Sequence, residues 1–457
     1  MDREARERDG LDENRSCWTA EAPPCEPLPA LARDGFADVA VIGGGLTGVS
    51  TAWHLSQRFP ERRIALLEAR SLGNGASGRN GGQLLTGIAG VEPEDPEEAR
   101  RIHEVTRSGV DLVAGWVERY AIEAGFARRG CVEVYTEART AEAAHARVER
   151  LRRAGVALEW LPAARSGLAG AHGAVRDPAC GRVNALALLR GLRPVLVAQG
   201  VAVHEGTPAL RVEEGREIRI ATPRAALRAG AVVLATDAYT PRLGRFRDGL
   251  LALHSHVVAT EPLPEARWRE LGWEGFDAFS DDRDRIAFGC RTAGGRLVFG
   301  GGANDAYAYS LGGSPVHAGR GAARAFAALE RRLAACLPAA AGAPVAHRWT
   351  GPIGITLDRV CSIGAGGEHR NVYHALGYSG HGLALAALAG RVLCDLYSGD
   401  AAPWRGLPFT DRRLPRLPPE PLRWLGYRLY TAATGRSPRR RGGGTRRGRA
   451  AHDREPA

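Results

Sequence analysis

Three glycines and an acid stand in this chain at a spacing that can bind a ligand through backbone groups. Gly43, Gly45 and Gly48 follow an apolar run, and Glu68 lies twenty residues beyond the last of them. The first glycine would make a tight turn, the second would let the backbone approach a pyrophosphate, and the third would let a helix pack on a strand. Glu68 could then accept hydrogen bonds from ribose hydroxyls. The pattern predicts a dinucleotide site; the alternative is a glycine-rich turn in an ordinary βαβ unit.

A second glycine-rich loop, residues 73–83, follows the acid directly. Its sequence is GNGASGRNGGQ, and its polar members include Ser77, Arg79, Asn80 and Gln83. Such a loop can wrap around an anion with backbone N–H groups, a hydroxyl and a guanidinium. A nicotinamide dinucleotide rarely needs a second loop, whereas the isoalloxazine of flavin adenine dinucleotide (FAD) extends past the pyrophosphate. The loop therefore indicates FAD, and the alternative is a flexible surface loop.

The periodicity of apolar residues predicts the elements that must hold these loops. Apolar runs at 39–42 and 63–67 predict two strands with a helix between them. Helices are also expected at 97–128, 139–155, 318–336 and 383–397, and strands at 200–204, 231–236 and 371–376. The region 250–310 is strand-rich and favours an antiparallel sheet over a substrate pocket. A further glycine turn, GYSGHG, occupies 377–382.

The predicted fold class is α/β. We expect a Rossmann-like FAD-binding domain (βαβ, with a GxGxxG turn) built from discontinuous segments, and an α+β substrate domain with a mainly antiparallel sheet. The expected boundaries are an N-terminal extension at 1–36, FAD-binding segments at 37–90, 146–245 and 346–400, a helical cap at 91–145, the substrate sheet at 246–345, a packing segment at 401–435 and a disordered tail at 436–457.

Composition narrows the class of protein. With 457 residues, 44% hydrophobic and 25% charged, the chain is typical of two soluble domains. All 62 basic side chains are arginine, which excludes Schiff-base and phosphate-loop lysines. Of the net charge of +11, the segment from Arg436 onward carries +6, so the folded body is only mildly basic and we expect no nucleic-acid binding by it.

Cysteine spacing and hydropathy indicate the compartment. The eight cysteines form no CxxC pair and none has a histidine at metal-ligand spacing, so we expect no metal site. Buried thiols in a reducing cytoplasm, no membrane-spanning run and a charged N-terminus predict a cytoplasmic protein. Only residues 419–441 could contact a membrane, as an amphipathic helix; a helix packed on the protein's own surface is the favoured alternative.

Five motifs, in order, resemble a known family. They are GGGLTG at 43–48, ASGRNGGQLL at 76–85, VVLATDAY at 232–239, WTGPIG at 349–354 and GYSGHG at 377–382. Together they closely resemble the D-amino-acid-oxidase-like family of FAD enzymes, from about residue 38 to 428. Within that family the chain is most similar to the gamma-glutamylputrescine oxidoreductase branch.

The resemblance implies how FAD is held. The glycines of the first turn would hold the pyrophosphate, Glu68 the ribose, and the turn at 380–382 would aim a helix N-terminus at the flavin N1–C2=O edge. The implied cofactor contacts are Gly43, Gly45, Leu46, Thr47, Gly48, Glu68, Ala69, Arg70, Ser77, Arg79, Asn80, Gly81, Gly82, Gln83, Ala209, Ala235, Thr236, Gly354, Gly380, His381 and Gly382.

The chain departs from the family pattern at three places. Asp237 stands where Asn is frequent, and Cys361 stands where Pro is frequent. The segment over the flavin, usually two aromatics and an arginine, reads FGCR at 288–291. A carboxylate at Asp237 would be unfavourable near a phosphate unless it points away, and the lost aromatic bulk leaves the precise amine open.

Catalysis in such an enzyme needs a neutral amine beside the flavin, and therefore a base or a deprotonating environment. The candidates are His256, Tyr378 and His381, although residues of these types are more often structural hydrogen-bonding groups than bases. Arg291 could bind a substrate carboxylate, because a guanidinium suits that partner, or could form an ordinary salt bridge.

The predicted function is an FAD-dependent oxidoreductase that oxidises the C–N bond of an amine or amino acid, gamma-glutamylputrescine-like or related, to an imine by hydride transfer to flavin N5. Water then hydrolyses the imine, and oxygen or another acceptor takes the electrons. One alternative is a sarcosine-type dehydrogenase or oxidase of N-methyl amino acids. An alternative of another class is a catalytically altered flavin-binding module with an arginine-rich interaction tail.

Overall fold

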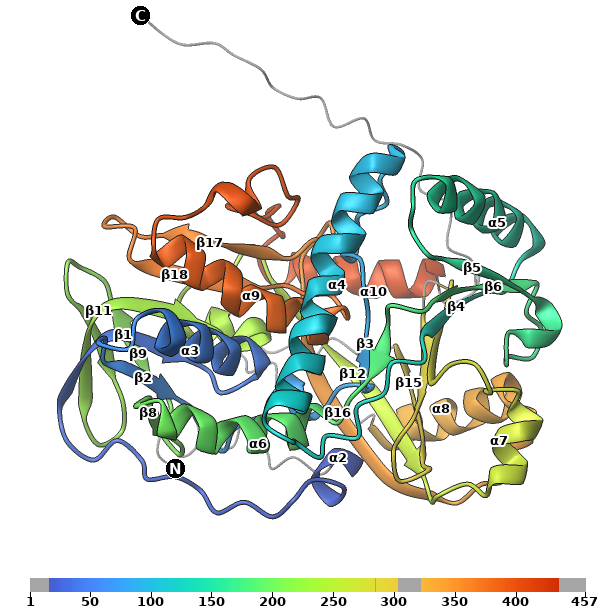
Figure 1. Cartoon of the computed structure of the whole chain (residues 1–457), viewed down its shortest axis with the longest axis horizontal. Coiled ribbons are helices and arrows are strands. Elements are labelled where there is room, and N and C mark those ends of the chain that lie inside the picture. Colours follow the sequence, from blue (N-terminus) through green and yellow to red (C-terminus); the bar gives the residue numbers. More distant parts are fainter. Residues whose placement is uncertain (1–15, 284, 303–321, 435–457) are drawn as a thin grey trace, which may run out of the picture.

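The computed structural model describes residues 16–283, 285–302 and 322–434, and two eight-stranded sheets organise them (Figure 1). The first sheet has the order β17-β18-β11-β1-β2-β8; in addition, β10 pairs with β11, and β9 pairs with β10. Its strands are β1 (Gly35–Ile42), β2 (Ile64–Leu67), β8 (Ala202–His204), β9 (Arg211–Glu213), β10 (Ile218–Ala221), β11 (Ala226–Leu234), β17 (Ser362–Gly366) and β18 (Val372–Leu376).

The centre of the first sheet is parallel. β1 pairs in parallel with β2 and β11, with Val39 opposite both Ile64 and Ala231, and β11 pairs in parallel with β18. All four residues of β2 are buried, as expected for a strand covered on both faces. The carboxyl ends of these strands meet at one edge of the sheet, which gathers the glycine turn after β1, the acid after β2 and the glycine turn after β18.

Helices cover the first sheet. They are α3 (Leu46–Arg58), α6 (Ala185–Ala198) and α9 (Gly382–Tyr397), of which α3 and α9 lie side by side, and α4 (Pro96–Arg119) packs against α9 (Figure 1). Small residues permit both close approaches. A Cβ at Gly390 of α9 would lie 2.1 Å from the Ser50 hydroxyl of α3, and one at Gly109 of α4 would lie 2.2 Å from the Ala384 carbonyl oxygen of α9. The small-residue composition of α9 therefore has a packing cause.

The second sheet is antiparallel apart from the parallel pair of β13 and β4. Its order is β16-β12-β15-β14-β13-β4-β6-β5, and a separate two-stranded sheet joins β3 to β7. The strands are β3 (Gln83–Leu84), β4 (Cys131–Tyr135), β5 (Glu159–Pro162), β6 (Gly173–Asp177), β7 (Gly181–Arg182), β12 (Leu251–Thr260), β13 (Ala278–Asp281), β14 (Ala287–Arg291), β15 (Leu297–Gly302) and β16 (Val345–Ile355).

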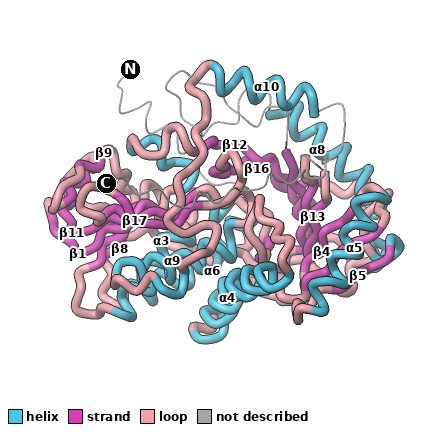
Figure 2. Tube along the Cα trace, turned by 90° about the horizontal axis from the view of Figure 1, so that it is seen from above, coloured by secondary structure: helices cyan, strands magenta, loops and turns pink. Residues whose placement is uncertain are grey.

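The two faces of the second sheet belong to different cores. Val257 and Cys290 pack in the large apolar cluster shared with the first domain. Val258 and Phe299 pack instead in a separate cluster with α7 (Glu265–Leu271) and α8 (Ala322–Cys336). The remaining helices are α2 (Cys17–Ala20), α5 (Ala138–Arg153) and α10 (Leu422–Thr434), the last at the periphery of the molecule (Figure 2).

The predicted fold class is confirmed, but several predicted boundaries differ from the sheet topology. Residues 146–177, expected in the FAD-binding domain, join the second sheet, because β4 pairs with β13 and carries β5 and β6 with it. β16, expected in the FAD-binding domain from residue 346, also joins the second sheet through β12. The predicted disordered tail at 436–457 lies outside the described residues. Among the described residues, every helix is too short or too polar to cross a membrane.

Candidate cofactor site

Two glycines of the first glycine turn, Gly43 and Gly48, stand where a side chain would clash with the backbone. Gly43 has a φ of +110°, and a Cβ there would lie 2.5 Å from the Ala235 carbonyl oxygen. A Cβ at Gly48 would lie only 1.9 Å from the Gly43 carbonyl oxygen. Gly45 begins α3 without a capping side chain, and no acid stands in the first turn of that helix. The backbone thus offers a helix N-terminus suited to a phosphate.

Glu68 ties the glycine turn to the end of β2. Its carboxylate accepts the backbone N–H of Gly44 at 2.7 Å and that of Arg70 at 2.9 Å. Burial raises the pKa of Glu68, and these two N–H groups oppose that rise. The segment that leads to the predicted cofactor contact Ala209 runs alongside, since the Gly206 and Thr207 N–H groups donate to the Arg70 and Glu68 carbonyls. Ala69, Arg70 and Ala209 therefore lie along neighbouring stretches of chain.

The loop 77–83 links both domains. Ser77 Oγ accepts the Leu46 N–H at 2.9 Å, at the start of α3. The buried Arg79 donates to the carbonyls of Asn74 and Thr350, at 2.8 and 3.3 Å. Gln83 then donates through Nε2 to two carbonyls of the second sheet, Phe279 at 2.8 Å and Gly289 at 2.9 Å. The loop therefore joins the glycine turn of one domain to the sheet of the other.

The N-terminal extension holds this loop from outside. Ser16 Oγ donates to the Gly78 carbonyl at 2.7 Å, and the Trp18 indole N–H donates to the Asn80 carbonyl at 2.8 Å. Trp18 is buried, and a Cβ at Gly82 would lie 2.7 Å from its ring. Sequence reasoning missed Trp18; the signal was a Cys-Trp pair within an extension rich in charge and proline.

The carboxylate of the half-buried Asp237 holds the GYSGHG turn. Asp237 accepts the Gly377 N–H through Oδ1 at 2.8 Å and the Gly354 N–H through Oδ2 at 2.9 Å. The turn is further fixed by the Ser379 N–H, which donates to the Gly354 carbonyl at 3.1 Å. Asp237 therefore points toward backbone donors, which explains how a carboxylate is accommodated close to the cofactor loops.

We expect Asp237→Ala to cost clearly more stability than Asp237→Asn. Alanine leaves two N–H groups without acceptors, at about 1–3 kcal/mol each, and must adopt the φ of +37° found at this position. Asparagine keeps one acceptor oxygen and tolerates a positive φ. Thermal unfolding and FAD titration of both variants measure the difference. Equal losses in the two variants would contradict the role of the carboxylate oxygens.

Asp237 should also make stability depend on pH. Burial raises the pKa of Asp237 above the ordinary value of 3.8, against the opposing effect of its N–H donors. The folded protein then keeps a proton that the unfolded chain has released, so this contribution to the unfolding free energy is full below pH 3.8 and is lost as pH rises through the folded pKa. Urea unfolding at several pH values measures this contribution. In Asp237→Asn, the unfolding free energy should not show this decline with rising pH.

Two of the catalytic candidates lie at the turn. The Tyr378 hydroxyl is 2.7 Å from the Thr47 hydroxyl in α3, and burial raises the pKa of Tyr378 well above its ordinary value. A phenol in that state stays protonated near neutral pH, which favours a structural role. His381 is the N-cap of α9, between Gly380, which has a φ of +99°, and Gly382.

The other two candidates point away from the glycine loops. His256 has its ring 5.3 Å from Phe326 of α8, on the same strand face as Val258. Arg291 pairs with Glu265 and lies over the Trp268 ring at 4.8 Å, both in α7. Alternation along β14 explains this, because Phe288 and Cys290 occupy the opposite face, against Gly81 and Gly82.

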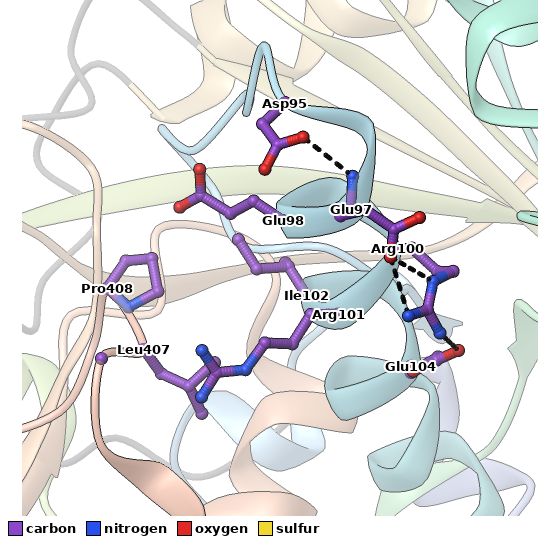
Figure 3. A pocket seen from close by; sticks show the side chains of 10 residues that line it. Asp95, Glu97, Glu98, Arg100, Arg101, Ile102, Glu104, Leu407 and Pro408 are labelled. Carbon is purple, nitrogen blue, oxygen red and sulfur yellow. Dashed lines mark hydrogen bonds and ion pairs between the residues drawn. The ribbon is translucent and has the colours of Figure 1, made fainter. Parts of the chain in front are cut away.

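Two hollows on the surface are separate from the cofactor residues. One, of about 480 Å³, lies between the start of α4 and residues 406–408 (Figure 3). Its Arg100 pairs with Glu97 and Glu104 at 2.9 and 2.7 Å, so these charges satisfy one another. Another, of about 440 Å³, is lined by Arg291 and Trp268 on the far side of the second sheet.

Comparison with known proteins decides the family. A model described as "FAD dependent oxidoreductase" (DAO) matches residues 38–396. The chain belongs to this family. It is 28% identical over 400 residues to gamma-glutamylputrescine oxidoreductase of Escherichia coli (strain K12), which covers 84% of this chain and 89% of that protein.

Solved structures share the fold. The crystal structure of glycine oxidase from Geobacillus kaustophilus has a TM-score of 0.67 at 22% identity, covering 84% of this chain and 99% of that one. L-proline dehydrogenase from P. horikoshii has a TM-score of 0.66 at 20% identity, covering 89% and 99%. As a DAO-family FAD-dependent oxidoreductase, the protein acts on CH–NH or CH–NH₂ donors.

The described residues fit FAD. A Cβ at Gly43, Gly44 or Gly48 would lie 2.5 Å or less from a neighbouring atom, the loop at 77–83 crosses between the domains, and Gly380 has open space where a Cβ would stand. α9, like α3, begins without a capping side chain or an acid in its first turn. Thr236 follows β11 at the same edge, with its hydroxyl 2.9 Å from that of Thr240. These features come from four segments of the chain, at 43–48, at 77–83, at Thr236 and at 380–382.

Proposed function

We propose that this oxidoreductase acts on an amine of the gamma-glutamylputrescine type, in which a γ-glutamyl group blocks one end of a diamine. The observation that carries the proposal is the 28% identity shared over 89% of the length of the Escherichia coli relative. The Phe288 ring, which lies against Gly81 of the loop at 77–83, is compatible with a long flexible amine chain.

FAD, when bound, supplies the acceptor for a hydride from the amine carbon. The amine nitrogen loses a proton, the C–N bond becomes an imine, and water hydrolyses the imine to a carbonyl compound and ammonia. The protein's part is to hold the loops at 43–48 and 77–83, to exclude water, and to place a base near the amine. We propose His381 for that base, because it stands between the two glycines that begin α9.

His381→Gln tests this role. Flavin content should remain close to that of the parent, since the turn at 380–382 is predicted to face the flavin through the helix N-terminus and not through the imidazole, while the rate of anaerobic flavin reduction should fall by about 10²-fold or more. The rate of the parent protein should rise with pH through a single ionisation that the variant lacks. A variant with the parental pH profile would exclude His381 as the base.

An anaerobic bleaching screen tests the substrate class. FAD-loaded protein is mixed in turn with gamma-glutamylputrescine, putrescine, glycine and sarcosine, and the loss of the visible absorbance of oxidised flavin is followed. We expect gamma-glutamylputrescine to reduce the flavin fastest. Faster reduction by sarcosine would favour the N-methyl amino acid alternative, and no reduction by any amine would favour the flavin-binding module.

A further inference from the structure

Helix α10 presents its leucines to solvent. Leu422, Leu425 and Leu429 are 57%, 48% and 64% exposed, and Tyr430 is 56% exposed. Spacings of three and four residues place the three leucines in one stripe along the helix. A helix that rests on a globular protein normally turns such a stripe inward, because burying leucine removes apolar surface from water.

The opposite face of α10 makes the contacts with the protein. Trp424, Tyr427 and Thr431 lie on that face and are the less exposed residues of the helix. Arg285 donates to the Thr431 carbonyl at 2.9 Å, and Arg423 donates to the Arg247 carbonyl at 2.9 Å. Among the described residues, α10 is therefore held mainly through this face, by polar and aromatic groups, while the leucine stripe faces outward.

The charge of this end of the chain is strongly positive. No acidic residue occurs between Glu420 and Asp453, whereas nine arginines do. Two of them, Arg423 and Arg428, are in α10 itself. An exposed leucine stripe flanked by arginines is the composition of a helix that lies in the boundary between lipid headgroups and acyl chains.

We propose that α10 docks this oxidoreductase on an anionic lipid surface. The leucines and Tyr430 would enter the headgroup boundary, and arginines would pair with lipid phosphates, each adding about 1 kcal/mol at such a surface. Charge argues against a second copy as the occupant, because two identical arginine-rich ends would repel each other. Nucleic acid would pair with the arginines but would leave the leucines in water.

Vesicle co-sedimentation of the full-length, FAD-loaded protein tests the proposal. The probes are vesicles of phosphatidylcholine alone and of phosphatidylcholine mixed with phosphatidylglycerol in equal parts. We expect binding to the mixed vesicles only, weakened by salt. The double variant Leu425→Glu with Leu429→Glu should bind at least about tenfold more weakly. Val197→Glu, at a position 48% exposed on α6, is the matched control and should bind as the parent does.

Several results would overturn the proposal. One is a parent protein that does not bind the mixed vesicles. A second is a leucine double variant that binds as tightly as the parent, since binding would then depend on arginines alone. A third is a parent dimer, seen by sedimentation velocity, that the double variant abolishes, which would assign the stripe to a second copy. Flavin absorbance and thermal unfolding confirm that each variant is folded.

Discussion

Gly48→Ala is expected to abolish stable FAD binding and to lower the unfolding free energy by about 1–3 kcal/mol. A Cβ at this position would lie 1.9 Å from the Gly43 carbonyl oxygen and 3.1 Å from its carbon, and neither backbone atom can rotate away. Relief requires α3 to move off the end of β1, which displaces Leu46 and Thr47 at the start of the helix. Flavin absorbance of the purified protein and its thermal unfolding midpoint measure the two effects.

Two further glycines serve as controls for that substitution. Gly115, in α4, has no atom within 4 Å of its ideal Cβ, so Gly115→Ala should leave FAD bound and raise stability by about 0.5–1 kcal/mol. At Gly45 the Cβ would lie 3.0 Å from the Ser77 hydroxyl, a group that can rotate, so Gly45→Ala should fall between the two. Full flavin content and a parental midpoint in Gly48→Ala would contradict the close-packing argument.

Trp18→Ala is expected to weaken FAD binding and to cost about 3–5 kcal/mol of stability. Trp18 lies outside the residues matched by the family model, yet its indole N–H donates to Asn80 and its ring packs against Gly82. Without the indole ring, the loop at 77–83 loses both this hydrogen bond and the packing against Gly82 that fixes its backbone, where φ is +80°. Titration of apoprotein with FAD and urea unfolding measure the two losses separately.

Trp404→Ala is the matched control for Trp18→Ala. Trp404 is also buried, at 5% exposure, and its indole N–H donates to Asp395 at 3.0 Å, near the end of α9 far from Gly382. Both substitutions delete the same side chain from a buried setting, so both should destabilise the protein. Only Trp18→Ala should also raise the dissociation constant of FAD, by more than its loss of unfolding free energy explains. An equal change in both variants would mean that Trp18 acts only through global stability.

The parallel core of the first sheet was predictable because its signals are local. β1, α3 and β2 are consecutive, so the strand, glycine turn, helix, strand order is visible in about thirty residues. For the second sheet, the sequence predicted an antiparallel arrangement but not which strands belong to the sheet. β4 and β13 pair although some 140 residues separate them, and apolar periodicity carries no record of a partner so distant.

The face of a strand on which a single side chain lies was likewise not predictable from local sequence. His256 and Val257 are neighbours in sequence, yet one faces α8 and the other faces the first domain. Because side chains alternate along a strand, the face that a residue joins depends on how the sheet packs, not on the residue itself. Arg291 illustrates the same point, since its neighbour Cys290 faces Gly82.

The sequence by itself determined the cofactor class, because the glycine turns and the loop that predict a dinucleotide site are short motifs with their own local geometry. It also determined that no lysine takes part in the chemistry. Only the tertiary structure decided that Asp237 holds the GYSGHG turn, that Trp18 holds the loop at 77–83, and that the leucines of α10 face outward. Each of these depends on contacts between segments far apart in the chain, whose energies arise only once both sheets have formed.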